Sequence, residues 1–179
     1  MKISLRMVLV ALVALVAIGG LISTIPSEQN AKPAAKATNY HDGQCSAEAG
    51  VTLVVDFGPT SGRETLVRCA KDFAGTGWQL FSAAQVEVSG TDEFATGFVC
   101  RVSGWPSVED QPCTSTPTPA EGTWAYFVST DEDTWQFSGQ GAAMRKPKCG
   151  SAEGWRFVEL GEVGSQSVPK ISPVTFGCK

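Results

Sequence analysis

Val51–Phe57 reads Val-Thr-Leu-Val-Val-Asp-Phe, and this stretch decides the fold class of the chain. It is short and rich in β-branched side chains, and Gly50 and Gly58-Pro59 bound it. A β-branched run between turn residues predicts a strand in the centre of a sheet. After the turn at Pro59–Gly62, a second strand is predicted at Thr65–Cys69.

The remaining residues predict more strands and one helix. Thr76-Gly77 precedes Trp78–Gln85, whose apolar side chains lie on one face at helical spacing, so we expect a short helix there. Trp124–Ser129 alternates at period two, as a strand does. Ser103–Pro119 is proline-rich and predicts a loop. We expect an α+β domain, a mostly antiparallel β-sheet with one short helix. Its other strands are expected at Phe98–Val102, Trp135–Ser138 and Trp155–Leu160, the last of which closes the sheet.

A long apolar segment stands near the N-terminus. Met7–Ile25 carries no charge, and Lys2 and Arg6 precede it without an acidic residue. As a helix, this segment would span about 28 Å, close to the thickness of the hydrocarbon core. Basic residues hold the preceding end in the cytoplasm, so the rest of the chain is expected outside. We therefore expect residues 7–25 to bind the membrane.

Two interpretations of this segment stay open. The apolar stretch of a cleaved signal peptide is about 7–15 residues long, with a small-x-small site just after it. Here the stretch is longer, and the clearest such site, Ala35-Lys36-Ala37, lies well beyond its end. An uncleaved membrane anchor is therefore favoured over secretion after cleavage. We expect a signal anchor or signal peptide at 1–26, a flexible tether at 27–43 and an extracytoplasmic domain at 44–179.

All six cysteines follow the membrane segment, in the oxidising compartment. An even number there argues for three disulfides. Zinc sites use closely spaced pairs, and the shortest gap here runs from Cys100 to Cys113. Six cysteines allow 15 connectivities, among which the sequence alone does not choose. We expect the sequential pairing, Cys45–Cys69, Cys100–Cys113 and Cys149–Cys178.

Charge and motif content argue against several functions. The chain has 14 basic and 18 acidic residues, and leaving out Lys2 and Arg6 gives 12 against 18, a net charge of −6. Nucleic acid needs a basic face, so we expect no such partner. The single histidine, His41, falls in the expected tether, where nothing would hold it for catalysis. We expect no enzyme, no catalytic residue, no metal and no cofactor.

Aromatic residues are the best candidates for a binding site. Four of the five tryptophans fall between residues 105 and 155, on the predicted C-terminal strands or beside them. Indole faces form flat apolar platforms for planar rings or sugar faces. The competing interpretation is that they fill the core of a small domain. The expected ligand-binding residues are Trp105, Trp124, Tyr126, Trp135 and Trp155.

Several blocks together resemble a known group of proteins. These blocks are Gly-Val-Thr-Leu-Val-Val-Asp-Phe-Gly at 50–58, Gly-Phe-Val-Cys-Arg-Val-Ser-Gly at 97–104, Gly-Thr-Trp-Ala-Tyr-Phe-Val at 122–128, and Gly-Trp-Arg-Phe at 154–157. They resemble small exported proteins of high-GC Gram-positive bacteria that look like the C-terminal domain of transcobalamin-like proteins. That group is a domain-of-unknown-function group, and the resemblance implies a β-grasp-like sheet with one helix.

The cysteines and one turn define how far this resemblance extends. Four cysteines fall where the bacterial group has four, whereas Cys149 and Cys178 are additional. The usual Asn-Gly turn after the aromatic strand is replaced by Ser129-Thr130-Asp131. In the wider family this domain helps to cover a corrinoid, and related bacterial genes are associated with vitamin or metal uptake. The matching cysteines are Cys45, Cys69, Cys100 and Cys113.

Two functions follow as expectations. The resemblance and the aromatic residues imply an extracytoplasmic ligand-binding or uptake-accessory module for a corrinoid or another planar ligand, held at the membrane beside a transporter partner. The alternative is a structural or protein-interaction domain of the cell envelope without a small-molecule ligand.

Overall fold

The structure, a computed structural model, describes residues 39–47, 49–118 and 120–178. These belong to one compact unit, Ala37–Lys179. The segment expected to bind the membrane, residues 7–25, lies outside the described residues, as does most of the expected tether. Within the described part of the chain, no helix has the length and apolar character needed to cross a membrane.

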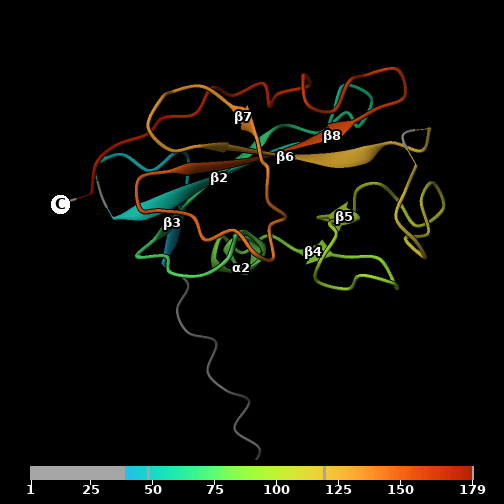
Figure 1. The fold of residues 1–179 in the computed structure, drawn as a ribbon, viewed down its shortest axis with the longest axis horizontal. Coiled ribbons are helices and arrows are strands. Elements are labelled where there is room, and N and C mark those ends of the chain that lie inside the picture. The colour runs from blue at the N-terminus through green and yellow to red at the C-terminus, as the bar shows by residue number, and fades with distance from the viewer. Residues whose placement is uncertain (1–38, 48, 119, 179) are drawn as a thin grey trace, which may run out of the picture. The chain divides into compact units, whose positions relative to one another are not determined.

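A mixed six-stranded sheet forms the centre of the domain (Figure 1). Neighbouring strands are antiparallel except for the central pair, β2 and β8, which is parallel. In spatial order the strands are β1 (Tyr40–Asp42), β3 (Leu66–Lys71), β2 (Gly50–Asp56), β8 (Ala152–Val158), β6 (Thr123–Ser129) and β7 (Gln136–Phe137).

Different structures cover the two faces of this sheet. Figure 1 shows the helix α2 (Gly77–Ala83) and the strands β4 (Val88–Ser89) and β5 (Arg101–Val102) on one side. The chain after β8 runs along the other side. We call these the helix face and the tail face. Side chains of a strand alternate between faces, so Leu53 and Val55 pack in the core beneath α2, whereas Thr52 and Asp56 point to the tail face.

The predicted central strand is confirmed as β2, of which all seven residues are buried. The strand predicted at 155–160 is also found, as β8, but it begins at Ala152 and lies inside the sheet. The sheet is mostly antiparallel, as predicted, but its central pair is parallel, and the prediction that this strand closes the sheet is wrong. Strand direction depends on the long crossover between β2 and β8, and no local pattern encodes it.

The predicted helix is confirmed, and its first turn explains where it begins. The Thr76 side chain accepts a hydrogen bond from the backbone N–H of Gln79 (3.3 Å), and the Gln79 side chain accepts one from the backbone N–H of Thr76 (2.9 Å). This capping box satisfies two backbone donors at the helix start. Leu80, Phe81 and Ala84 are fully buried against the sheet, as their spacing predicted.

All three predicted disulfides are confirmed: Cys45–Cys69, Cys100–Cys113 and Cys149–Cys178. Three disulfides are consistent with an extracytoplasmic, oxidising location. The first two are buried, whereas both cysteines of the third are exposed. The third bond joins the segment before β8 to the C-terminal end of the chain, and so closes the segment that covers the tail face.

Two segments differ from the prediction. Tyr40–Asp42, inside the expected tether at 27–43, forms the edge strand β1 and pairs with β3. The polar composition of this segment concealed the strand, because an edge strand needs little apolar surface. The strand expected at Phe98–Val102 is reduced to Arg101–Val102. Residues 103–118 are a loop without a strand, as expected.

Candidate functional site

Three of the five predicted binding residues meet on the helix face. Trp124 and Tyr126 are two residues apart on β6, so they share a face, and Tyr126 lies opposite Trp155 in the register of β6 and β8. The rings of Tyr126 and Trp155 are stacked, with centroids 4.4 Å apart and planes 11° from parallel. All three side chains belong to the main core.

The other two predicted residues lie apart from these three, Trp105 at the edge of the same core and Trp135 on the opposite face. Trp105 contacts Phe157 edge-on, with centroids 6.0 Å apart, and the Arg63 guanidinium stands over its ring at 5.7 Å. Trp135 packs on the opposite face, where its Nε1 donates a hydrogen bond to the carbonyl oxygen of Ile171 (2.9 Å). Its ring lies so close to Gly154 that a Cβ there would stand 2.8 Å from it. Trp135 therefore acts in packing the tail segment.

A cavity of about 240 Å³ opens beside the aromatic trio. Trp124, Tyr126 and Trp155 line it together with two chain segments, residues 97–99 before β5 and residues 137–142 after β6. We call it the aromatic cavity. A concave, mostly apolar space with a few polar groups is the usual form of a small-molecule site.

Two tryptophans of this cavity carry unsatisfied hydrogen-bond donors. The Nε1 atoms of Trp124 and Trp155 are buried and have no hydrogen-bond partner in the described part of the chain. The two side chains are only 6% and 4% exposed. A buried donor without a partner costs about 1–3 kcal/mol. Trp105 Nε1 is in the same state outside the cavity, so two of the three such donors belong to tryptophans that line the cavity.

A buried ionic cluster of Glu153 and Arg145 contacts Tyr126, one of the three aromatic residues of the cavity. The carboxylate of Glu153, fully buried on β8, accepts hydrogen bonds from the Tyr126 hydroxyl and from Arg145 Nε, which lies 3.1 Å from both carboxylate oxygens. Burial raises the pKa of Glu153, and the hydrogen bonds from Arg145 and Tyr126 oppose that rise without cancelling it. Burial, followed by the charge of Glu153, also raises the pKa of Tyr126, so its hydroxyl remains a donor.

The start of α2 fixes the wall of the aromatic cavity. The backbone N–H of Gly77 donates to the Arg145 carbonyl oxygen (2.9 Å), and that of Trp78 donates to the Ala142 carbonyl oxygen (3.0 Å). Any Cβ at Gly77 would collide with the Tyr126 hydroxyl. Helix, wall and ionic cluster thus hold one another, so the cavity is preformed by packed secondary structure.

A second cavity, of about 290 Å³, lies at the N-terminal end of α2. Thr76, Trp78 and Gln79 line it from the helix side, and Thr96 and Ala143 line it from the two loops. We call it the helix cavity. Trp78 is half-buried there, and no sequence pattern distinguishes it from a core tryptophan.

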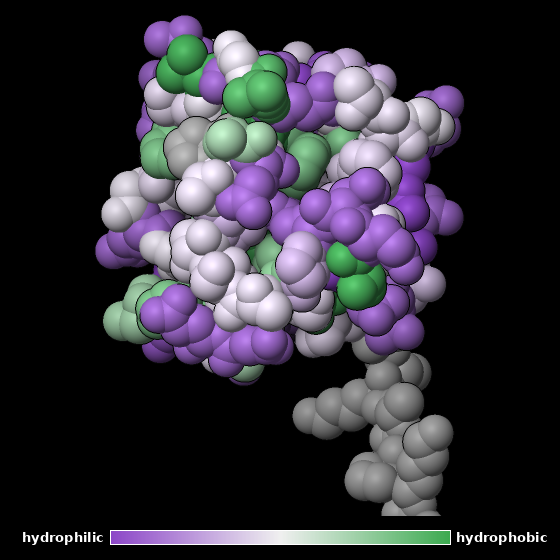
Figure 2. All heavy atoms as spheres, turned by 90° about the vertical axis from the view of Figure 1, so that its right-hand side faces the viewer, coloured by the Kyte–Doolittle hydropathy of each residue, from purple (hydrophilic) through white to green (hydrophobic). Residues whose placement is uncertain are grey.

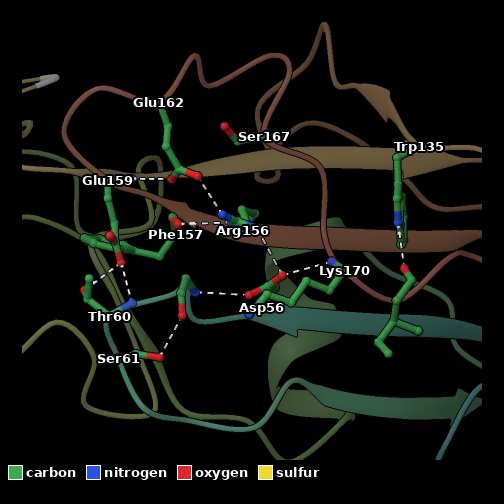
Figure 3. Close-up of polar contacts among 12 residues, drawn as sticks. Asp56, Thr60, Ser61, Trp135, Arg156, Phe157, Glu159, Glu162, Ser167 and Lys170 are labelled. Carbon is green, nitrogen blue, oxygen red and sulfur yellow. Dashed lines mark hydrogen bonds and ion pairs between the residues drawn. The ribbon is translucent and has the colours of Figure 1, made fainter.

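The tail face carries a different polar network, shown in Figure 3. Asp56 of β2 accepts hydrogen bonds from Arg156 on β8 (3.4 Å) and from the backbone N–H of Lys170 (2.9 Å). Arg156 also binds Glu162 (2.7 Å), which lies in the segment after β8. The network therefore fastens the C-terminal segment across the sheet.

Sequence reasoning missed the two charged residues of the cavity cluster. Glu153 lies on the same face as Trp155, two residues away, so its position in a buried strand would have revealed it if β8 had been predicted to start at Ala152. Arg145 lies in a loop outside the predicted strands and helix, so no local pattern indicates that it pairs with Glu153. Within the described residues, no group of His, Cys, Asp and Glu side chains could hold a metal ion.

Comparisons with protein-family models, with curated proteins and with solved structures found no match to this chain. The resemblance to transcobalamin-like domains therefore stays a prediction from the sequence.

Proposed function

We propose that this protein is an extracytoplasmic binding module that holds a small ligand with a flat face in the aromatic cavity. The single observation that carries this function is the cavity itself, lined by Trp124, Tyr126 and Trp155, two of which carry buried, unsatisfied indole donors. A ligand with hydrogen-bond acceptors would compensate for these donors if small side-chain movements brought them into contact.

The volume of the cavity limits the size of the ligand that it can bind. Sites for drug-sized ligands have about 300–1,000 Å³, and this cavity has about 240 Å³. It suits one ring, or one part of a larger molecule. A corrinoid, the ligand that the sequence resemblance implies, would place only a peripheral group inside it.

An uptake-accessory role agrees with the predicted location. The three disulfides support an oxidising compartment, and the apolar segment at 7–25 would keep the domain at the membrane. A sheet with one short helix and a parallel central pair supports the β-grasp-like fold that the resemblance implies. In this proposal the domain presents its ligand to a membrane transporter.

Fluorescence titration tests the proposal. The full chain is titrated with a corrinoid, with haem and with oligosaccharides, and binding at the aromatic cavity shifts the emission of Trp124 and Trp155. Gly139→Leu adds a side chain at the cavity lining, where a Cβ meets nothing within 4 Å, and should abolish the shift. Gly164→Leu, equally unobstructed and outside the lining, is the matched control. A flat signal for every probe would refute the proposal.

One observation favours the alternative, a protein-interaction domain of the envelope. Several large apolar side chains after β8 are exposed, up to 75% for Leu160. On the face drawn in Figure 2, however, apolar side chains stand in separate groups among hydrophilic ones, whereas a protein interface usually shows a contiguous patch. Crosslinking to an envelope protein that is lost in Leu160→Ser would support this alternative. The exposed residues are Leu160, Val163, Val168, Ile171 and Val174.

A further inference from the structure

The two cavities of the helix face adjoin each other. Thr96 and Ala143 line the helix cavity, and their direct neighbours in the chain, Gly97 and Ala142, line the aromatic cavity. Consecutive Cα atoms are about 3.8 Å apart. The two linings therefore meet at two backbone segments, and an extended ligand that reaches both cavities has to cross the rim that these segments form.

Neither cavity is lined by a charged residue. Their linings combine aromatic rings with hydroxyl and amide side chains, and they contain no Asp, Glu, Lys, Arg or His. Arg145, the charged residue behind the aromatic cavity, is already paired with Glu153. A charged ligand group would lose its hydration here without gaining a partner, which is strongly unfavourable. The linings therefore select a neutral ligand.

Polar groups of the two linings remain able to bind such a ligand. The side chains of Gln140 in the aromatic cavity and Thr96 in the helix cavity are exposed, and neither forms a hydrogen bond to another described residue. Each lining also has indole rings: Trp124 and Trp155, which are 6% and 4% exposed, in one, and the half-buried Trp78 in the other. The partly exposed apolar indole of Trp78 and the uncharged donors and acceptors of both linings match a sugar ring, which has an apolar face and a rim of hydroxyl groups.

We infer that the ligand is a neutral oligosaccharide of at least two rings, with one ring in the aromatic cavity and the next in the helix cavity. This inference rests on the proposed binding function and specifies its ligand class. Each cavity is smaller than a drug-sized site, so each holds one ring-sized unit of the chain.

Calorimetric titration of the full chain tests the inference, in a detergent without a sugar head group. The neutral probes are maltose, maltotriose, chitobiose and chitotriose, each compared with its monosaccharide. The charged probe of equal length is trigalacturonic acid. We expect at least one neutral series to bind, with a gain of tenfold or more from one ring to two, and at least tenfold weaker binding of trigalacturonic acid.

Variants assign each ring to a cavity. Gly139→Leu should weaken the binding of the longer neutral probe at least tenfold, and Gly164→Leu should leave that binding unchanged. Thr96→Leu replaces an exposed side chain of the helix cavity, so it should preserve the fold and remove only the gain from the second ring. Trp78→Ala should have the same effect, with its folding checked by circular dichroism.

The outcomes separate the two proposals. Equal or tighter binding of trigalacturonic acid, or no gain from a second ring, overturns the oligosaccharide inference. Binding of haem or a corrinoid alone, abolished by Gly139→Leu, also overturns it while the proposed binding function stands. Failure of every probe, planar or saccharide, refutes both.

Discussion

The helix face and the tail face of one sheet bury the same kind of ion pair and reach different results. On the helix face Glu153 binds Arg145 and Tyr126, and a cavity remains beside them. On the tail face Asp56 binds Arg156, and the C-terminal segment packs over the pair (Figure 3). The pair Asp56–Arg156, which we call the tail pair, therefore fastens a covering segment. The pair Glu153–Arg145 on the helix face supports the lining of a cavity.

The covering elements explain the difference. The helix α2 has seven residues, about 10 Å of length, whereas six strands span about 24 Å across a sheet. One such helix cannot cover the face, and the aromatic cavity lies toward β6 and β7, beyond the helix. The tail face is crossed by a long segment that the bond Cys149–Cys178 closes. No residue of α2, β4 or β5 lines the aromatic cavity, so the cavity lies where these elements leave the sheet uncovered.

The largest effect is expected from breaking the tail pair. Asp56→Ala removes the partner of buried Arg156 on β2, while Arg156 keeps Glu162. Because breaking a buried ion pair costs about 3–5 kcal/mol when the remaining charge is left unpaired, we expect a loss at the lower end of that range. The variant also removes the acceptor of the Lys170 N–H. Urea denaturation should show the loss, and amide exchange should accelerate at Lys170. Asp131→Ala, in the exposed turn between β6 and β7, is the control and should change stability by less than about 0.5 kcal/mol.

Opening the covering segment from its other end should have the next largest effect. Removing both cysteines of the exposed disulfide, with Cys149→Ala and Cys178→Ala together, should cost about 2–4 kcal/mol in the free energy of unfolding. Ligand binding on the helix face should persist, because the cavity lining does not include the tail. Loss of binding together with retained folding would show that the two faces are coupled.

A smaller change tests the helix itself. Thr76→Ala removes the side chain that accepts from the Gln79 N–H, and loss of such a cap costs about 1 kcal/mol. Thermal unfolding measures this loss. Thr60→Ala, which removes a hydrogen bond to Glu159 at an exposed turn, is the matched control and should cost less. An equal loss in both variants would contradict the capping role.

The smallest change in stability, when measured at acid pH, is expected from Glu153→Gln. Burial raises the pKa of Glu153 above 4.5, so the folded protein binds this proton more tightly than the unfolded chain does. The stability from this group is therefore present below the unfolded pKa and lost as pH rises through the folded pKa. Because Glu153→Gln mimics the protonated form, its stability relative to the natural protein should rise over that range. Urea denaturation at several pH values checks this, and a constant difference would contradict the raised pKa.

Local patterns were sufficient for most of the elements. The strand at 51–57 followed from β-branched residues between glycines, and the helix followed from Thr76 and the spacing of Leu80, Phe81 and Ala84. Period-two alternation also placed Trp124 and Tyr126 on one face. The disulfides were predicted from the number and order of the cysteines. Each of these inferences depends on residues near one another in the chain, or on their count.

The tertiary structure alone decided which elements became neighbours. The antiparallel register of β6 with β8 placed Trp155 against Tyr126, whereas Trp135, beside the edge strand β7, packs on the other face, so that only three of five predicted residues share the cavity. The position of β8 between β2 and β6 buried Glu153 beside Arg145. Strand order arises from the summed burial and pairing of segments far apart in sequence, whereas a local pattern records only the periodicity of its own element. The sequence by itself therefore determined the strands, the helix and the disulfide-stabilised class of this protein, and only the folded sheet decided where its cavity lies.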